Sequence, residues 1–154
     1  MFKFLKKKKR DNRHFGFDSD NNWYNVAEKG IKQYDSLSTS ERIWFNIRGI
    51  IDSTNNGGLI SYYYNSGAEN VYDAIDDFKL IGFENIADLI QKYNKILFKG
   101  NNVPKDIQER NKFINELDEQ TDDLLQNLEI ELANMIDNIE KQLDIYLRKE
   151  KLID

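Results

Sequence analysis

The strongest constraint on the fold is a run of 46 residues, 106–151, that contains neither glycine nor proline. Most of its apolar residues recur every three or four positions, which is the spacing of one face of a helix. The stripe consists of Leu117, Leu124, Leu128, Leu132, Met135, Ile139, Leu143 and Tyr146. It predicts one long helix, or two helices with a break near 120–122. Because the spacing is not a clean heptad, we expect this face to pack on other helices of the chain rather than in an extended coiled coil.

Shorter helical patterns precede this run. An apolar stripe over 22–35 is interrupted by Gly30, and a capping box at 38–41 opens a helix that ends at 55–58. Residues 59–65 are too short and isolated to pair as a strand, so we expect a short helix there. Two further helices follow, one from Asn70 to Gly82 and one over 84–98, before a loop at 101–104. The sequence therefore predicts an all-α fold, a compact single-domain bundle of about six helices with a long C-terminal helical segment.

Several classes of functional site are excluded by composition. The chain has no cysteine and a single histidine, His14. A disulfide framework, a thiolate or multi-histidine metal site and a cysteine nucleophile are therefore ruled out. Hydrolysis by two carboxylates stays open in principle, but no spacing singles out an acid and a base. We expect a protein that is not an enzyme and that holds no metal or cofactor.

Charge is distributed unevenly along the chain. The net charge is −5, yet residues 1–17 carry seven basic side chains and one acidic one, which leaves −11 for the rest. We expect a basic, disordered leader over 1–20 and an acidic helical domain over 21–154. The leader lacks the apolar stretch of a secretory signal. We therefore expect a cytoplasmic protein whose leader is either a solvated tail or makes a weak contact with a membrane surface.

Two groups of acidic residues are candidate partner-binding sites. The first is Asp73, Asp76 and Asp77 on one helix, and the second is the densest acidic run, Glu116, Asp118, Glu119, Asp122 and Asp123. Like charges one helical turn apart repel each other, so such faces are solvated or meet a cationic partner. A calcium loop is excluded because the run lacks the central glycine. An acidic body also repels phosphates, so we expect no direct nucleic-acid binding by the folded domain.

A motif in the middle of the chain carries a family resemblance. Its residues are Glu41, Arg42, Asn56, Gly57, Gly58, Tyr62, Tyr63, Asn65, Ser66, Ala74, Ile81 and Gly82, followed by weaker similarity at 103–113 and 143–150. Over roughly 36–150 the chain resembles a bacterial family of largely uncharacterised function, typified by a DNA-mimic protein. The resemblance implies an all-α fold. It also implies, for the typifying member, acidic side chains that imitate DNA phosphates and occupy the DNA-binding surface of a regulator.

We expect the motif residues to be structural. The Asn-Gly-Gly turn stops a helix, although its exposed amides could instead cradle an anion. Of the three consecutive tyrosines 62–64, at least one should be buried and one exposed, because helical neighbours point about 100° apart.

Two functions follow from the sequence. The favoured hypothesis is a binding module whose acidic helical surface meets a basic protein, such as a DNA-binding regulator, by DNA mimicry. The alternative is an immunity-type or antitoxin-type protein that neutralises one cognate toxin. A homodimer is compatible with either.

Overall fold

The computed structural model describes residues 20–154, with side chains from residue 22 onward. This part of the chain forms seven α-helices and two short 3-10 turns, and it contains no strand. The helices are α1 (Asp20–Lys32), α2 (Thr39–Gly57), α3 (Leu59–Tyr63), α4 (Val71–Leu80), α5 (Glu84–Leu97), α6 (Ile107–Asn115) and α7 (Glu119–Lys149). The predicted all-α single-domain fold is confirmed, with seven helices instead of about six. The predicted leader lies outside the described residues except for its last residue, which begins α1.

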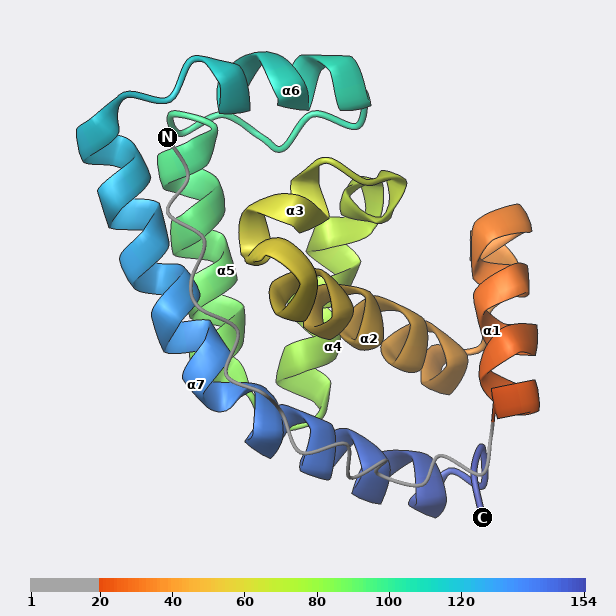
Figure 1. The fold of residues 1–154 in the computed structure, drawn as a ribbon. Coiled ribbons are helices and arrows are strands. Elements are labelled where there is room, and N and C mark those ends of the chain that lie inside the picture. Colours follow the sequence, from red (N-terminus) through yellow and green to blue (C-terminus); the bar gives the residue numbers. More distant parts are fainter. Residues whose placement is uncertain (1–19) are drawn as a thin grey trace.

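The helices are arranged around α2, which contacts α1, α3, α4 and α7. On the other side of α4, α5 packs between α4 and α7. Figure 1 shows the long α7 curving along one side of the molecule, from the α6 end to the C-terminus. The start of α1 lies close to the C-terminal end of α7, where the Asn22 side chain donates a hydrogen bond to the Leu152 carbonyl at 3.2 Å.

Local sequence signals account for most helix ends. The capping box is present, since Ser38 accepts from the Glu41 amide and Glu41 accepts from the Ser38 amide. The break in the C-terminal run lies at 116–118, slightly before the predicted position. It lies there because the Asp118 side chain caps α7 by accepting from the Thr121 amide at 2.7 Å. Asn70 precedes α4 as predicted, but its side chain makes no capping hydrogen bond.

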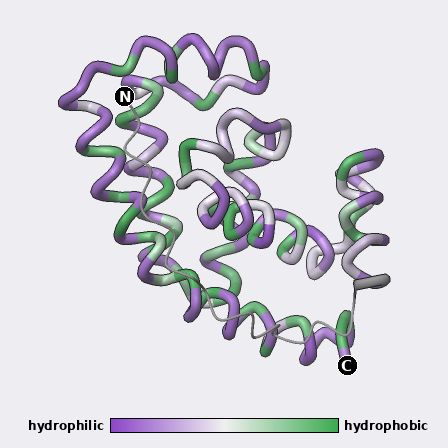
Figure 2. Tube along the Cα trace, viewed as in Figure 1, coloured by the Kyte–Doolittle hydropathy of each residue, from purple (hydrophilic) through white to green (hydrophobic). Residues whose placement is uncertain are grey.

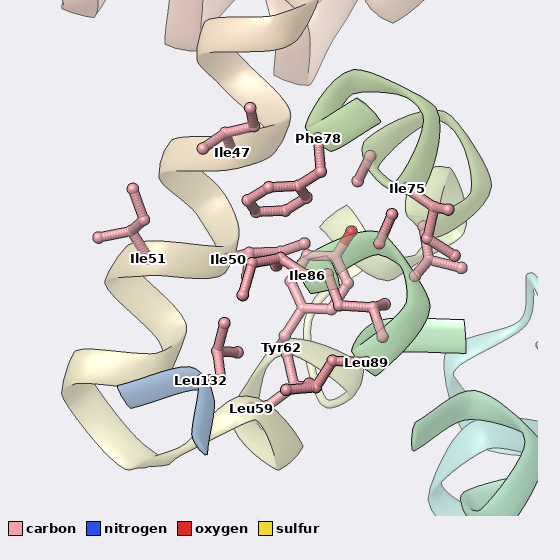
Figure 3. Close-up of a cluster of buried hydrophobic side chains, with 14 of the residues drawn as sticks. Ile47, Ile50, Ile51, Leu59, Tyr62, Ile75, Phe78, Ile86, Leu89 and Leu132 are labelled. Atoms are coloured by element: carbon pink, nitrogen blue, oxygen red, sulfur yellow. The ribbon is translucent and has the colours of Figure 1, made fainter. Parts of the chain in front are cut away.

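The core forms where α2, α3, α4, α5 and α7 meet (Figure 3). The apolar spacing of the helices predicted at 70–82 and 84–98 directs one side of each toward the core, and all of these residues are buried: Val71, Ile75, Phe78, Ile81, Ile86, Leu89, Ile90, Tyr93 and Leu97. On α7 the predicted stripe is shifted by one residue at three places, because Leu125, Ile136 and Leu147 are the buried members of adjacent apolar pairs. Leu124 is consequently exposed, which corrects its assignment to the core.

Candidate functional site

The sequence-predicted acidic residues of α4 do not form one solvated face. Asp77 is completely buried and accepts hydrogen bonds from Arg42, at 2.6 Å from Nη2, and from Asn46, at 2.8 Å. Burial raises the pKa of Asp77, and the hydrogen bonds from Arg42 and Asn46 oppose that rise. The expectation that Asp77 contacts a partner is therefore wrong, because its carboxylate already binds Arg42 across the α2–α4 interface.

The other two acids of α4 differ from Asp77 and from each other. Asp73 is half-buried and accepts a hydrogen bond from the Tyr34 hydroxyl at 3.1 Å. That hydroxyl also accepts from Asn46, so Asp73 belongs to the edge of the same polar network. Asp76 is exposed and pairs with Lys79 at 3.3 Å. Only Asp76 thus remains on the open surface of this helix.

The second acidic group is brought together where α6 turns into α7. We call Glu116, Asp118, Glu119, Asp122 and Asp123 the acidic corner. Four of its residues are exposed and Asp122 is half-buried. Among the described residues, no lysine or arginine forms an ion pair with any of these five carboxylates. Hydrogen bonds from Thr121 lower the pKa of Asp118, which keeps that carboxylate ionised. Figure 2 shows mostly hydrophilic residues over α6 and the first turns of α7.

The Asn-Gly-Gly turn has a structural use that the sequence did not reveal. Gly58 ends α2 with φ +86°, and a Cβ at this position would overlap the Glu129 carboxylate. Glu129, from α7, accepts hydrogen bonds from the Ile60 amide and from the Tyr93 hydroxyl, both at 2.7 Å. The anion bound at this turn is therefore the protein's own Glu129 carboxylate. Through its hydrogen bonds Glu129 links α7 to α3 and α5.

The aromatic part of the motif is also internal. Tyr62 and Tyr63 are buried and Tyr64 is exposed, as helical spacing predicts. Tyr63 stacks on Tyr93 with ring centroids 5.6 Å apart. The Asn65 side chain donates to the Ser61 carbonyl, which closes the turn after α3.

Arg110 is a second structural residue that sequence reasoning missed. Its side chain is fully buried and donates to four main-chain carbonyls, those of Tyr63, Asn65, Pro104 and Lys105, at 2.7–2.9 Å. Burial lowers its pKa from the usual arginine value. The sequence contained only a weak indication of this role, because Arg110 is one residue of the weaker family similarity at 103–113. The guanidinium ties α6 and the preceding loop to the end of α3.

Glu129 is expected to make the stability of the folded protein depend on pH. Burial raises the pKa of Glu129 above the usual glutamate value, against hydrogen bonds from Tyr93 and Ile60 that lower it. The Glu129 carboxyl therefore binds its proton more tightly in the folded state than in the unfolded state. Its deprotonation lowers the free energy of unfolding as pH rises from about 4.5 through the raised pKa. Glu129→Gln keeps the acceptor oxygen without the buried charge.

We expect Glu129→Gln to unfold at a higher temperature than the parent at pH 7 and at nearly the same temperature at pH 4. Thermal unfolding followed by circular dichroism between these pH values measures the difference. Glu131→Gln, an exposed residue of the same helix, serves as the control and should behave like the parent. A lower unfolding temperature for Glu129→Gln at pH 7 would mean that the charge-assisted hydrogen bonds outweigh the cost of burial.

The described residues form neither a cluster suited to a metal ion nor a helix suited to span a membrane. Within residues 20–154, no group of three or more acidic or histidine side chains is placed to hold a metal ion. No helix in the same part of the chain has the length and apolar character needed to cross a membrane.

Comparison with known proteins places the chain at the level of the family. The model of a family described as DMP19-like protein matches residues 35–150, which cover every element from the second half of the first 3-10 turn to the end of α7. No curated protein and no solved structure matches the chain. Residues 1–34, which include α1 and the first residue of the first 3-10 turn, and the last four residues lie outside the match. Because the match spans most of its length, the chain belongs to the DMP19-like protein family.

Proposed function

We propose that this protein acts by binding rather than by catalysis, and that its acidic corner occupies the basic DNA-binding surface of a partner protein. The observation that carries the proposal is the corner itself, five carboxylates within eight residues that lack a basic partner among the described residues. Membership of a family typified by a DNA mimic supports the same function.

Charge explains why such a corner suits a DNA-binding surface. Proteins that bind DNA gather lysine and arginine side chains to neutralise phosphates, so their binding surfaces are strongly positive. Carboxylates three or four residues apart on α7, such as Glu119 and Asp123, lie on neighbouring turns of one helix side and present a row of negative charge. Such complementary charges accelerate association and make it sensitive to salt.

The corner can be neutralised without removing a helix cap. We expect the variant Glu116→Gln, Glu119→Gln, Asp122→Asn, Asp123→Asn to bind the partner about fourfold to several hundredfold more weakly, since four exposed ion pairs together contribute about 0.8–4 kcal/mol. Asp118 is retained because it caps α7. The partner is first isolated from a cell lysate by its binding to the parent protein. Its titration at two salt concentrations, by calorimetry or surface plasmon resonance, measures the loss of affinity.

A matched control changes the net charge equally at other places. The variant Asp35→Asn, Glu84→Gln, Asp88→Asn, Glu131→Gln neutralises four exposed acids outside the corner. This variant should bind nearly as well as the parent. Equal weakening by both variants would show that only the overall negative charge matters, and unchanged binding by the corner variant would refute the acidic-corner proposal.

Neutralisation of a cognate toxin is the alternative function that the experiment must distinguish from DNA mimicry. A toxin held by a different surface would tolerate the corner variant and would not be displaced by duplex DNA.

A further inference from the structure

We propose that Glu129 makes the binding of a cationic partner at the acidic corner depend on pH, because its carboxylate adds a negative charge beside the corner when it is ionised. The inference rests on the proposed function, which supplies the corner as the binding surface. Glu129 follows Asp122 by seven residues on α7. Seven residues make about two helical turns, so both residues lie on the same side of the helix, roughly 10 Å apart along its axis.

Three other helices hold the Glu129 side chain in place. Its Oε1 accepts hydrogen bonds from the Ile60 amide of α3 and from the Tyr93 hydroxyl of α5, both at 2.7 Å. Its Oε2 lies against Gly58, at the end of α2, in space that a Cβ at this position would occupy. The carboxylate is therefore held at one place relative to the first turns of α7, and its charge acts on the corner from that place.

The charge of Glu129 has no basic partner in the part of the chain that the structure describes. Its side chain is half-buried, and no lysine or arginine of residues 22–154 forms an ion pair with it. The titratable groups that act on it are Tyr93 of α5, Tyr63 of α3 and Asp122 of its own helix. Burial raises the pKa values of both tyrosines, so they stay neutral and Asp122 supplies the charge among these three groups.

Glu129 loses its proton at a higher pH than an exposed acid does. Burial raises its pKa, the hydrogen bonds from Tyr93 and Ile60 oppose that rise, and the negative charge of Asp122 adds to it. Exposed carboxylates lose their protons near pH 4. The ionisation of Glu129 therefore adds a charge beside the corner at a pH where exposed acids are already ionised.

Cation binding at the corner strengthens as pH rises through the pKa of Glu129. Below that pH the side chain is neutral, and above it a further negative charge attracts the cation from roughly 10 Å. Between the dielectric constants of water and of a protein surface, one charge at this distance changes affinity about two- to tenfold. The coupling is reciprocal, so a cation bound at the corner lowers the pKa of Glu129 and favours release of its proton.

Titration of the full chain with an octalysine peptide at low salt, by calorimetry between about pH 4.5 and pH 8, tests the proposal. Across this range we expect the affinity of the parent to rise about two- to tenfold more than that of Glu129→Gln. Glu131→Gln removes an exposed acid from the same helix and should keep the pH dependence of the parent. All other titratable groups are common to the parent and Glu129→Gln, so the difference between these two proteins measures the effect of Glu129.

A second measurement tests the coupling without any cation. The carboxyl carbon resonance of Glu129, identified by its loss in Glu129→Gln, is followed by NMR as pH is changed. Asp122→Asn should move its titration midpoint to lower pH, because a like charge is removed, whereas Asp35→Asn should leave the midpoint in place.

The outcomes separate this inference from the proposed function. Equal pH dependence of octalysine binding in the parent and in Glu129→Gln, or an unchanged midpoint in Asp122→Asn, would overturn the coupling alone. Octalysine binding of equal strength by the parent and by the variant with a neutralised acidic corner would refute the corner as the binding surface, and with it both proposals.

Discussion

Replacement of Asp77 by alanine is expected to destabilise the protein by about 3 kcal/mol, because it removes the carboxylate that pairs with Arg42 across the α2–α4 interface. The loss leaves two donors without their acceptor. Asn46, which is buried, loses the hydrogen bond to Asp77 at 2.8 Å. Arg42 retains some contact with water, which limits the cost. Urea unfolding followed by circular dichroism measures the change in the free energy of unfolding.

The neighbouring residue provides the control for this prediction. Asp76→Ala removes an exposed carboxylate one residue earlier on the same helix and is expected to change stability by no more than about 0.5 kcal/mol. The double variant Arg42→Ala, Asp77→Ala should cost clearly less than the sum of the two single variants, because the pair acts as a unit. Equal effects of Asp76→Ala and Asp77→Ala would contradict the burial of the Arg42–Asp77 pair.

The largest loss is expected for Arg110→Met. Four main-chain carbonyls lose the guanidinium donors that reach them at 2.7–2.9 Å, and a buried acceptor left unpaired costs about 1–3 kcal/mol. Some of these carbonyls will gain water as α6 loosens, so we expect a loss of about 4 kcal/mol. We also expect faster hydrogen exchange in α6, because Arg110 ties this helix to the end of α3.

Two variants make the Arg110 prediction specific. Lys112→Met removes an exposed cation from the same helix and should be nearly neutral. Arg110→Lys keeps the charge but cannot reach four acceptors with the fork of a guanidinium, so it should recover only part of the lost stability. A loss below about 1 kcal/mol in Arg110→Met would contradict the role of this side chain as the link between α6 and α3.

Much of the fold could be predicted from local sequence patterns, because local chemistry determines them. The capping box at Ser38 and Glu41 and the helix end at Gly58 each depend on a few adjacent residues. The apolar spacing of α4 and α5 likewise predicted their buried sides. Spacing alone could not choose between adjacent apolar residues such as Leu124 and Leu125, since either fits one helix face. Packing against the other helices determines which of the two residues is buried.

The polar contacts between distant residues could not be predicted in the same way. Asp77 is 35 positions from Arg42, and Glu129 is 69 positions from Ile60. A signal for Asp77 was nevertheless present, because it lies three residues after Ala74 and four before Ile81, on the side of α4 that turns inward. No comparable signal marked Glu129, whose role depends on how α7 meets the turn at Gly58.

Residues of the family motif hold the helices of the molecule together. Arg42, Gly58, Tyr62 and Tyr63 are used in contacts within the molecule. The carboxylates of the acidic corner, in contrast, form no ion pair with any lysine or arginine among the described residues, so internal contacts do not explain why so many acids gather there. This difference is why we propose that the corner, rather than the motif, binds the partner.

The most direct test of this account is capture of the partner on the immobilised full chain, from a lysate of the cells that produce it, followed by elution with duplex DNA. The account predicts that a DNA-binding protein is retained by the parent, released by duplex DNA, and not retained by the variant with a neutralised acidic corner. A partner that duplex DNA does not release, and that the corner variant retains as well as the parent, would contradict it.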